Sequence, residues 1–163
     1  MKIKLAKTEL IHFVGIGGIG MSGLALIMNG KGFKVQGSDI ANNKNIERLR
    51  KEKIKVFIGH KKQNIEKGTI LVVSSAIKKN NPELLAAKRK QLPIYKRGEM
   101  LANIVSLTKN IVVVGSHGKT TTTSLIASIF QETKIDPTII NGGVINSINN
   151  SAKLGKSDWS ILE

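Results

Sequence analysis

The sequence of 163 residues contains no cysteine and only three histidines, at positions 12, 60 and 117. The first absence excludes disulfides and thiolate metal ligands, and the wide spacing of the histidines argues against a zinc site. The chain also lacks an apolar run approaching the roughly 20 residues that span a bilayer. Its start, MKIKLAKTEL, has no apolar centre of a secretory signal. We therefore expect a soluble, cytoplasmic protein with no membrane association.

Acidic and aromatic residues are also scarce. There are 11 Asp and Glu against 26 Lys and Arg, which gives a net charge of +15, and aromatic residues make up only 4%. The basic residues are spread over short clusters such as Lys61-Lys62 and Lys78-Lys79, with no rings between them. A nucleic-acid binder would more often concentrate its charge and supply stacking rings. Solvated lysine-rich helix faces and polyanionic small substrates explain the charge better, so we expect no nucleic-acid partner.

A glycine loop, GSHGKTT at residues 115–121, follows four apolar residues and precedes the helix-compatible segment TTTSLIASIF. Backbone N–H groups of such a loop and the positive end of the next helix hold oxyanions; the lysine neutralises terminal phosphates and a threonine hydroxyl can ligate Mg²⁺. Only Ser116 and His117 separate the glycines, whereas the standard phosphate loop has four residues there. The context nevertheless favours a nucleoside triphosphate site over an ordinary glycine turn.

A second glycine cluster, GIGGIG at residues 15–20, follows the strand-like segment IHFV and leads into an apolar run from Leu24 to Met28. In the G-x-G-x-x-G pattern the glycines permit a tight turn, close approach of a pyrophosphate and close packing of helix on sheet. Asp39 follows the next expected strand, where a dinucleotide site has an acidic residue for the ribose. The pattern predicts a pyrophosphate site but does not by itself choose the ligand.

Strands and helices alternate along the chain, which predicts an α/β fold with a doubly wound parallel sheet. The length suffices for one ordinary α/β domain and would be cramped for two full ones. We expect a Rossmann-like domain at 1–108 and the beginning of a phosphate-loop α/β domain at 109–163. The expected strands are 10–15, 33–37, 54–58, 69–74, 92–95, 110–115, 137–140 and 159–163, and the expected helices are about 18–30, 44–52, 82–90, 97–107 and 119–132.

The last residue, Glu163, follows directly on a fresh apolar run. A carboxylate at the end of a new strand predicts that the chain stops inside a domain and is a fragment. The Gly142-Gly143 pair after the preceding expected strand predicts a turn with positive φ.

Taken together, these segments resemble the Mur ligase family of peptidoglycan synthesis over essentially the whole chain. IHFVGIGGIGMSGLA is similar to the opening of one of its enzymes. GSHGKTTTTSLIA is similar to the family's G-T-H-G-K-T-T-T loop, with Ser116 in place of Thr. SSAI, KRGEML and NGGVINS are similar to intervening segments. These motifs are specific in combination.

The resemblance implies that the first glycine cluster holds the pyrophosphate of a UDP-sugar, through Gly15, Gly17, Gly18, Gly20, Met21 and Ser22. Asp39 would lie near the nucleoside, and Ser74 and Ser75 would line the same crevice. Other interpretations stay open: Asp39 as a turn or cap acid, the serines as a hydroxyl-satisfied turn, and Arg97 as either a substrate-anion contact or the partner of Glu99 in a surface ion pair.

The resemblance further implies an ATP loop formed by Gly115, Ser116, His117, Gly118, Lys119, Thr120 and Thr121. Lys119 would contact the β- and γ-phosphates, and Thr120 and Glu163 would ligate Mg²⁺. His117 would lie near a substrate phosphate or carboxylate, or else face water. His12, His60 and Trp159 are interpreted as structural.

The activity that the resemblance implies is ATP-dependent joining of L-alanine to UDP-N-acetylmuramate through an acyl phosphate, although we expect this fragment alone to be inactive. A muramyl-tripeptide recycling ligase is an alternative, but its first loop typically departs from GIGGIGM. An NAD-dependent Rossmann oxidoreductase would use the first cluster and Asp39, yet no catalytic acid or base of a second domain is apparent. A non-enzymatic nucleotide-sensing module would keep both loops. The oligomeric state cannot be predicted from the sequence.

Overall fold

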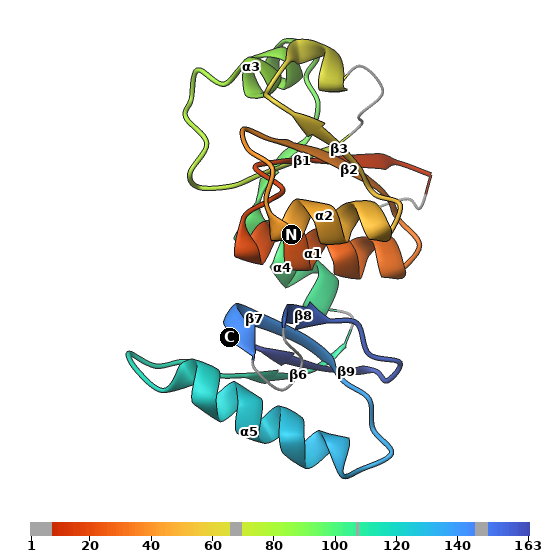
Figure 1. Cartoon of the computed structure of the whole chain (residues 1–163), viewed down its shortest axis with the longest axis vertical. Helices are drawn as coiled ribbons and strands as arrows, with labels where there is room; N and C mark the ends of the chain where they lie inside the picture. Colours follow the sequence, from red (N-terminus) through yellow and green to blue (C-terminus); the bar gives the residue numbers. More distant parts are fainter. Residues whose placement is uncertain (1–7, 66–69, 107, 146–149) are drawn as a thin grey trace.

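The computed structural model describes residues 8–65, 70–106, 108–145 and 150–163. They form two β-sheets that lie one above the other in Figure 1, with helices between them and on their outer faces. No helix in the described ranges is long and apolar enough to cross a bilayer.

The first sheet has five parallel strands in the order β3-β2-β1-β4-β5. After β1 the chain adds β2 and then β3 on one side of it, and it then crosses over to add β4 and β5 on the other side. The carboxyl ends of β1 and β4 therefore flank a switch point, which is where open α/β sheets bind ligands. The strands are β1 Leu10–Val14, β2 Lys34–Asp39, β3 Lys55–Ile58, β4 Ile70–Val73 and β5 Ile94–Lys96.

Helices cover both faces of this sheet. In Figure 1, α1 (Ile19–Gly30), α2 (Lys44–Lys51) and α4 (Arg97–Val105) lie on the side toward the second sheet, and α3 (Pro82–Arg89) lies on the other. Asparagines start two of them: the side chain of Asn43 accepts the N–H of Ile46, and that of Asn81 accepts the N–H of Glu83. A short 3₁₀ helix, η1 (Lys62–Ile65), precedes β4.

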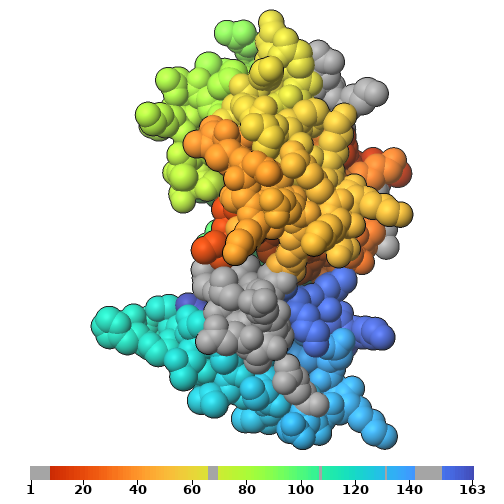
Figure 2. Space-filling model, in the orientation of Figure 1, coloured from red at the N-terminus to blue at the C-terminus, as the bar shows by residue number. Residues whose placement is uncertain are grey.

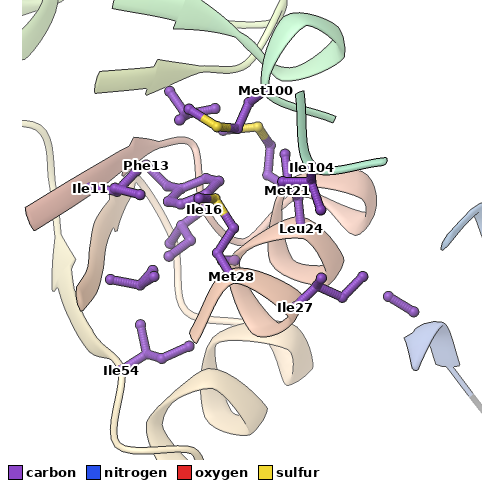
Figure 3. Packing of buried hydrophobic residues seen from close by; sticks show 14 of the residues in the cluster. Ile11, Phe13, Ile16, Met21, Leu24, Ile27, Met28, Ile54, Met100 and Ile104 are labelled. Atoms are coloured by element: carbon purple, nitrogen blue, oxygen red, sulfur yellow. The ribbon is translucent and has the colours of Figure 1, made fainter. Parts of the chain in front are cut away.

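The period-two alternation of β1 separates two environments on the sheet. Ile11 and Phe13 pack with Leu24 and Met28 of α1 and Met100 of α4 in the main core (Figure 3). The opposite face carries a smaller apolar cluster of Val14, Leu71, Ile65 and Ala87. The parallel register places polar side chains on this second face as well, namely those of His12, Gln36 and Ser38.

The second sheet has the order β6-β9-β7-β8. Its strands are β6 Lys109–Val112, β7 Thr138–Ile145, β8 Asn150–Lys153 and β9 Trp159–Leu162. β9 runs parallel to both β6 and β7, and β8 runs antiparallel to β7. Helix α5 (Lys119–Gln131) packs on the outer face of this sheet through Ala127, which contacts a cluster with Ile139 and Ile161 (Figure 1).

The two parts share an apolar contact. Ile140, Ala152 and Leu162 of the second sheet belong to the same buried cluster as Ile27 of α1. Nη2 of Arg48 on α2 donates a hydrogen bond of 3.3 Å to the carbonyl of Ala152. Figure 2 shows the blue surface of the second part directly against the orange surface of the first. Burial of apolar side chains from both sheets stabilises this arrangement.

The predicted α/β alternation is confirmed, with corrections in the second part. Gly142-Gly143 does not form the predicted turn: both residues lie inside β7, which continues to Ile145 and pairs with an unpredicted antiparallel β8. The register between β7 and β8 shifts between Ile140 and Ile145, so the glycines fall at an irregularity of the ladder. The strand predicted at 110–115 ends at Val112, and the helix predicted at 97–107 ends at Val105. Positions 69 and 107 lie outside the described residues.

Candidate functional site

The loop of residues 15–18 connects β1 to α1 at the switch point. Gly15 has a φ of +82°, which favours glycine, and its N–H donates to the carbonyl of Ser38 at 2.8 Å. The N–H of Ile16 donates to the same carbonyl at 3.0 Å. The end of β2 therefore fixes the first bend of the loop.

Gly17 is held from both sides. Its N–H donates to Oδ2 of Asp39 at 2.8 Å, and its carbonyl accepts from the side chains of Asn45, at 2.8 Å, and Asn43, at 3.3 Å. A Cβ added at Gly17 would lie within 3 Å of both Asn43 and Asp39. Gly18 is different, because the nearest atom to an added Cβ is the Gly15 carbonyl oxygen at 3.5 Å, an ordinary contact. The protein itself thus leaves room at Gly18.

A cavity of about 630 Å³ opens beside this loop, a size within the range of small-molecule sites. It lies where the carboxyl ends of β1, β2, β3 and β4 meet. Five of the predicted UDP-substrate residues line it, and so does a histidine that was interpreted as structural. The lining residues are Gly15, Gly17, Gly18, Asp39, Ile40, Asn43, His60, Ser74, Ala76, Ile77, Lys78, Asn80, Asn81 and Pro82.

The other predicted UDP-substrate residues, Gly20, Met21, Ser22, Ser75 and Arg97, are not among those lining residues. Met21 is buried in the main core, and the hydroxyl of Ser22 donates to the carbonyl of Ile19 at 3.0 Å. The side chains of Met21 and Ser22 therefore face the protein interior rather than the cavity.

Arg97 lies beside the start of α1. A Cβ added at Gly20 would be 2.9 Å from Nη1 of Arg97, so the guanidinium covers this glycine. The carboxylate of Glu99, the alternative partner for Arg97, accepts the N–H of Lys96 at 2.7 Å in the capping box of α4. The guanidinium is therefore close to the glycine loop and to the positive end of α1.

Behind the cavity lies a buried polar network centred on the carboxylate of Glu83, at the first turn of α3. Oε2 accepts from the hydroxyl of Ser38 at 2.5 Å, and Oε1 accepts from Nδ2 of Asn64 at 2.6 Å. Nδ1 of His60 and Nε2 of His12 are 3.2 and 3.5 Å from Oε2. Burial by itself raises the pKa of Glu83, but the neighbouring His12 and the hydrogen bonds from Ser38 and Asn64 outweigh it and hold the pKa below its ordinary value.

The second glycine loop connects β6 to α5. Gly118 is the N-cap of α5, with a φ of +74° that favours glycine. Nζ of Lys119 folds back to donate to the carbonyls of Gly115, at 2.9 Å, and Ser116, at 3.4 Å. The ammonium group therefore lies over the loop. His117 and Thr121 are exposed to solvent.

Thr120 and Glu163 meet at the end of this loop. Oγ1 of Thr120 donates to Oε2 of Glu163 at 2.9 Å, across 43 positions of sequence. Glu163 directly follows β9, the strand between β6 and β7, and its N–H donates to the carbonyl of Ile140 at 3.0 Å. The next residue of β7, Asn141, is buried, and neither of its side-chain amide atoms has a partner among the described residues. Buried amides normally have a hydrogen-bond partner, so this one is available to a bound group.

Nothing in the described part of the chain gathers three or more His, Asp or Glu side chains into a metal cluster. The donor pair of Thr120 and Glu163 nevertheless has the chemistry that Mg²⁺ prefers, a hydroxyl and a carboxylate oxygen beside a phosphate-binding loop. The residues present therefore fit a magnesium ion that is also held by phosphate and water oxygens.

The parallel sheet and the cavity at its switch point place the molecule among the Rossmann-like α/β proteins. The family model described as "Mur ligase family, catalytic domain" matches residues 10–109. The chain belongs to the Mur ligase family.

Individual relatives agree with this assignment. The chain is 80% identical over 163 residues, all of its length, to a UDP-N-acetylmuramate–L-alanine ligase from Pelagibacter ubique, of which it covers 35%. It is 54% identical over 153 residues, 94% of its length, to the ligase of the same name from Azorhizobium caulinodans, of which it covers 33%. The chain thus spans about a third of the length of these curated relatives.

Solved structures show the same fold. A UDP-N-acetylmuramate-alanine ligase from Thermotoga maritima has a TM-score of 0.85 at 32% identity, over 93% of this chain and 36% of that one. A UDP-N-acetylmuramate:L-alanyl-gamma-D-glutamyl-meso-diaminopimelate ligase from Neisseria meningitides has a TM-score of 0.87 at 28% identity, over 95% of this chain and 52% of that one. The predicted fold class and the resemblance to Mur ligases are confirmed.

Proposed function

We propose that this chain is the UDP-sugar-binding part, together with the first segment of the ATP-binding part, of a cytoplasmic ligase that joins L-alanine to UDP-N-acetylmuramate. The observation that carries the proposal is the cavity beside Gly15, Gly17 and Gly18, in a chain 80% identical to a relative with that name. We place the boundary between the two parts at residues 108 and 109, just before β6 begins.

In the first part, the open backbone surface at Gly18 and the positive end of α1 would receive the pyrophosphate. Arg97 adds a positive charge next to Gly20. Asp39 holds Gly17 in place and also lines the cavity, so it would both position the loop and face the nucleoside. Ser74 would contact the ligand from the end of β4. Met21 packs in the main core and Ser22 bonds within α1, so they would support the loop rather than contact the ligand with their side chains.

In the second part, the backbone of residues 115–121 would hold the phosphates of ATP, with Lys119 leaving its loop carbonyls for the β- and γ-phosphates. Thr120 and Glu163 would hold Mg²⁺, which supplies positive charge against the charge that develops on the transferred phosphoryl group. His117 is exposed at the loop and would be free to contact a bound substrate.

The proposed chemistry activates a poor electrophile. In the whole protein, an oxygen of the muramoyl carboxylate attacks the γ-phosphorus of ATP, and ADP leaves. The amine of L-alanine then attacks the acyl phosphate, phosphate leaves, and an amide remains. Lys119 and the loop N–H groups would stabilise the phosphoryl transfer, and both loops would fix the reacting groups in position. We assign turnover to the whole protein and UDP-sugar binding to residues 1–163.

Isothermal titration of the chain with UDP-N-acetylmuramate and, separately, with NADH tests the proposal. We expect saturable binding of the UDP-sugar and none of the dinucleotide. Competition by UDP but not by N-acetylmuramate alone would show that the nucleotide half is the part recognised. Binding of NADH in preference to the UDP-sugar would overturn the proposal in favour of a Rossmann oxidoreductase.

A further inference from the structure

The buried carboxylate of Glu83 controls the hydrogen bonding of a histidine on the cavity wall. The hydroxyl of Ser38 has one hydrogen, which it donates to Oε2 of Glu83 at 2.5 Å. Nδ1 of His60 is 2.9 Å from that hydroxyl oxygen and 3.2 Å from Oε2. Both neighbours of Nδ1 are acceptors toward it, so Nδ1 carries a hydrogen.

The position of this hydrogen also determines the role of the other ring nitrogen of His60, Nε2. In a neutral imidazole only one nitrogen carries a hydrogen, so Nε2 is an acceptor. His60 lines the cavity, and its side chain is only 11% exposed. No hydrogen bond to Nε2 is formed within the described part of the chain. A ligand group that donates a hydrogen bond would satisfy it.

His12, on the other side of Glu83, has the opposite tautomer. Nε2 of Gln36 donates to the carbonyl of Asn64 at 2.8 Å, which identifies it as the amide nitrogen. The same nitrogen is 3.1 Å from Nδ1 of His12, so that ring nitrogen accepts. The hydrogen of His12 is then on Nε2, 3.5 Å from Oε2 of Glu83. At this distance Nε2 of His12 forms no hydrogen bond within the described residues, so its hydrogen only lies beside the carboxylate, whereas that of His60 is directed at Oε2. Both hydrogens favour an ionised Glu83.

The same network also anchors the glycine loop. Ser38, which Glu83 holds through its hydroxyl, accepts the N–H groups of Gly15 and Ile16 with its carbonyl. The next residue, Asp39, accepts the N–H of Gly17. The carboxylate therefore fixes, through one residue of β2, both the anion-binding loop and the histidine of the cavity wall.

We propose that Glu83 is a positioning residue of the cavity, which holds His60 as the Nδ1–H tautomer and so presents Nε2 as an acceptor to a hydrogen-donating group of the bound nucleoside. The inference rests on the proposed binding of a UDP-sugar. The ligand group that donates to Nε2 of His60 would be an N–H of the base or a hydroxyl of the ribose.

Nitrogen NMR of the imidazoles at mildly alkaline pH tests the first half without any ligand. We expect His60 to be the Nδ1–H tautomer and His12 the Nε2–H tautomer in the wild type, and Glu83→Gln to lose the single tautomer at His60. Glu47→Gln, which removes a charge from an exposed position of α2, is the matched control and should change neither ring. A hydrogen on Nε2 of His60 in the wild type would overturn the inference.

Titration with UDP-N-acetylmuramate tests the second half. We expect about a tenfold loss of affinity in His60→Phe and at least that loss in Glu83→Gln, which also removes the anchor of Ser38. The double variant should bind no more weakly than Glu83→Gln, because the contact of His60 depends on Glu83. If Glu83→Gln does not fold, His60→Phe, on the cavity wall, gives the result alone. Wild-type affinity in His60→Phe would refute the inference while leaving the proposed function intact. Absence of UDP-sugar binding in the wild type would refute the proposed function instead. The tautomer measurement would then still show whether Glu83 sets the tautomer of His60.

Discussion

The hydroxyl of Thr120 donates to the carboxylate of Glu163 at 2.9 Å, joining the first turn of α5 to the end of β9. The relationship follows from topology, because β9 lies next to β6, and the loop after β6 leads into α5. Parallel strands bring residues that are distant in sequence to one edge of the sheet.

Replacement of Thr120 by valine should weaken magnesium-dependent nucleotide binding. The variant loses the hydroxyl and leaves Glu163 without this donor, and a lost hydrogen bond to a charged group corresponds to roughly a tenfold change in affinity. Thr120→Ser should retain most of the affinity. Ser128→Ala, farther along α5, is the control. ATP titrations with and without Mg²⁺ measure the effect, and equal magnesium dependence in Thr120→Val and the wild type would contradict the proposed metal pair.

Replacement of Lys119 by methionine should lower ATP affinity without lowering stability. Among the described residues Nζ donates to two loop carbonyls and to no other group, and both hydrogen bonds are exposed. Its loss should therefore change the free energy of unfolding by less than about 0.5 kcal/mol. Denaturant unfolding and nucleotide titration separate the two effects. A large loss of stability would show that the lysine serves the fold rather than the phosphates.

Replacement of Gly37 by alanine should destabilise the first sheet. A Cβ at this position of β2 would lie 2.6 Å from the carbonyl oxygen of Phe13 and 2.8 Å from Cβ of Ile16, and neither atom belongs to a movable side-chain end. We expect a loss of roughly 1–3 kcal/mol, typical of overpacking in a core. Gly98→Ala, in the first part of α4 with open space around it, should be neutral or slightly stabilising. Equal unfolding midpoints for the two variants would be inconsistent with the packing described.

The pH dependence of stability should carry a contribution from Glu83. Its pKa is lowered on folding despite its burial, because the neighbouring His12 and the hydrogen bonds from Ser38 and Asn64 favour the charged form. The folded state therefore binds this proton less tightly than the unfolded state does. The resulting stability is present above the ordinary pKa of 4.5 and is lost as the pH falls through the folded pKa. Carboxyl carbon NMR should show a titration midpoint below 4.5, and a midpoint above it would mean that desolvation prevails.

Much of the fold could be predicted because short sequence patterns indicate its strands and bends. The apolar run before each glycine loop predicts the strands β1 and β6, and the glycines themselves predict the bends that follow. β1 is buried as such a run suggests, whereas β6 is largely exposed. Gly142 and Gly143 misled because β7, which contains them, pairs with β8 on either side of them, and local preference does not contain that contact. β8 is a short strand whose one apolar residue, Ala152, gives too little alternation to indicate a half-buried strand.

The candidate site was predictable in part for the same reason. Gly15, Gly17, Gly18 and Asp39 lie at the expected loop, but sequence alone left open whether Asp39 was a turn acid or a ligand contact. His60 was interpreted as structural, although its place just after β3 was a usable signal, since side chains at carboxyl ends of parallel strands meet at the ligand crevice. The buried role of Glu83 depends on Ser38, 45 positions away, and no local pattern indicates it.

The central claim is that backbone N–H groups of the first glycine loop hold the pyrophosphate of a UDP-sugar, and Gly18→Ala tests it most directly. The protein has room for this methyl group, so the fold should be unchanged, whereas a ligand in contact with the backbone should be displaced. Calorimetric titration with UDP-N-acetylmuramate should show an affinity at least about tenfold weaker than that of the wild type and of Gly98→Ala. Wild-type affinity in a folded Gly18→Ala variant would place the ligand elsewhere and contradict the account.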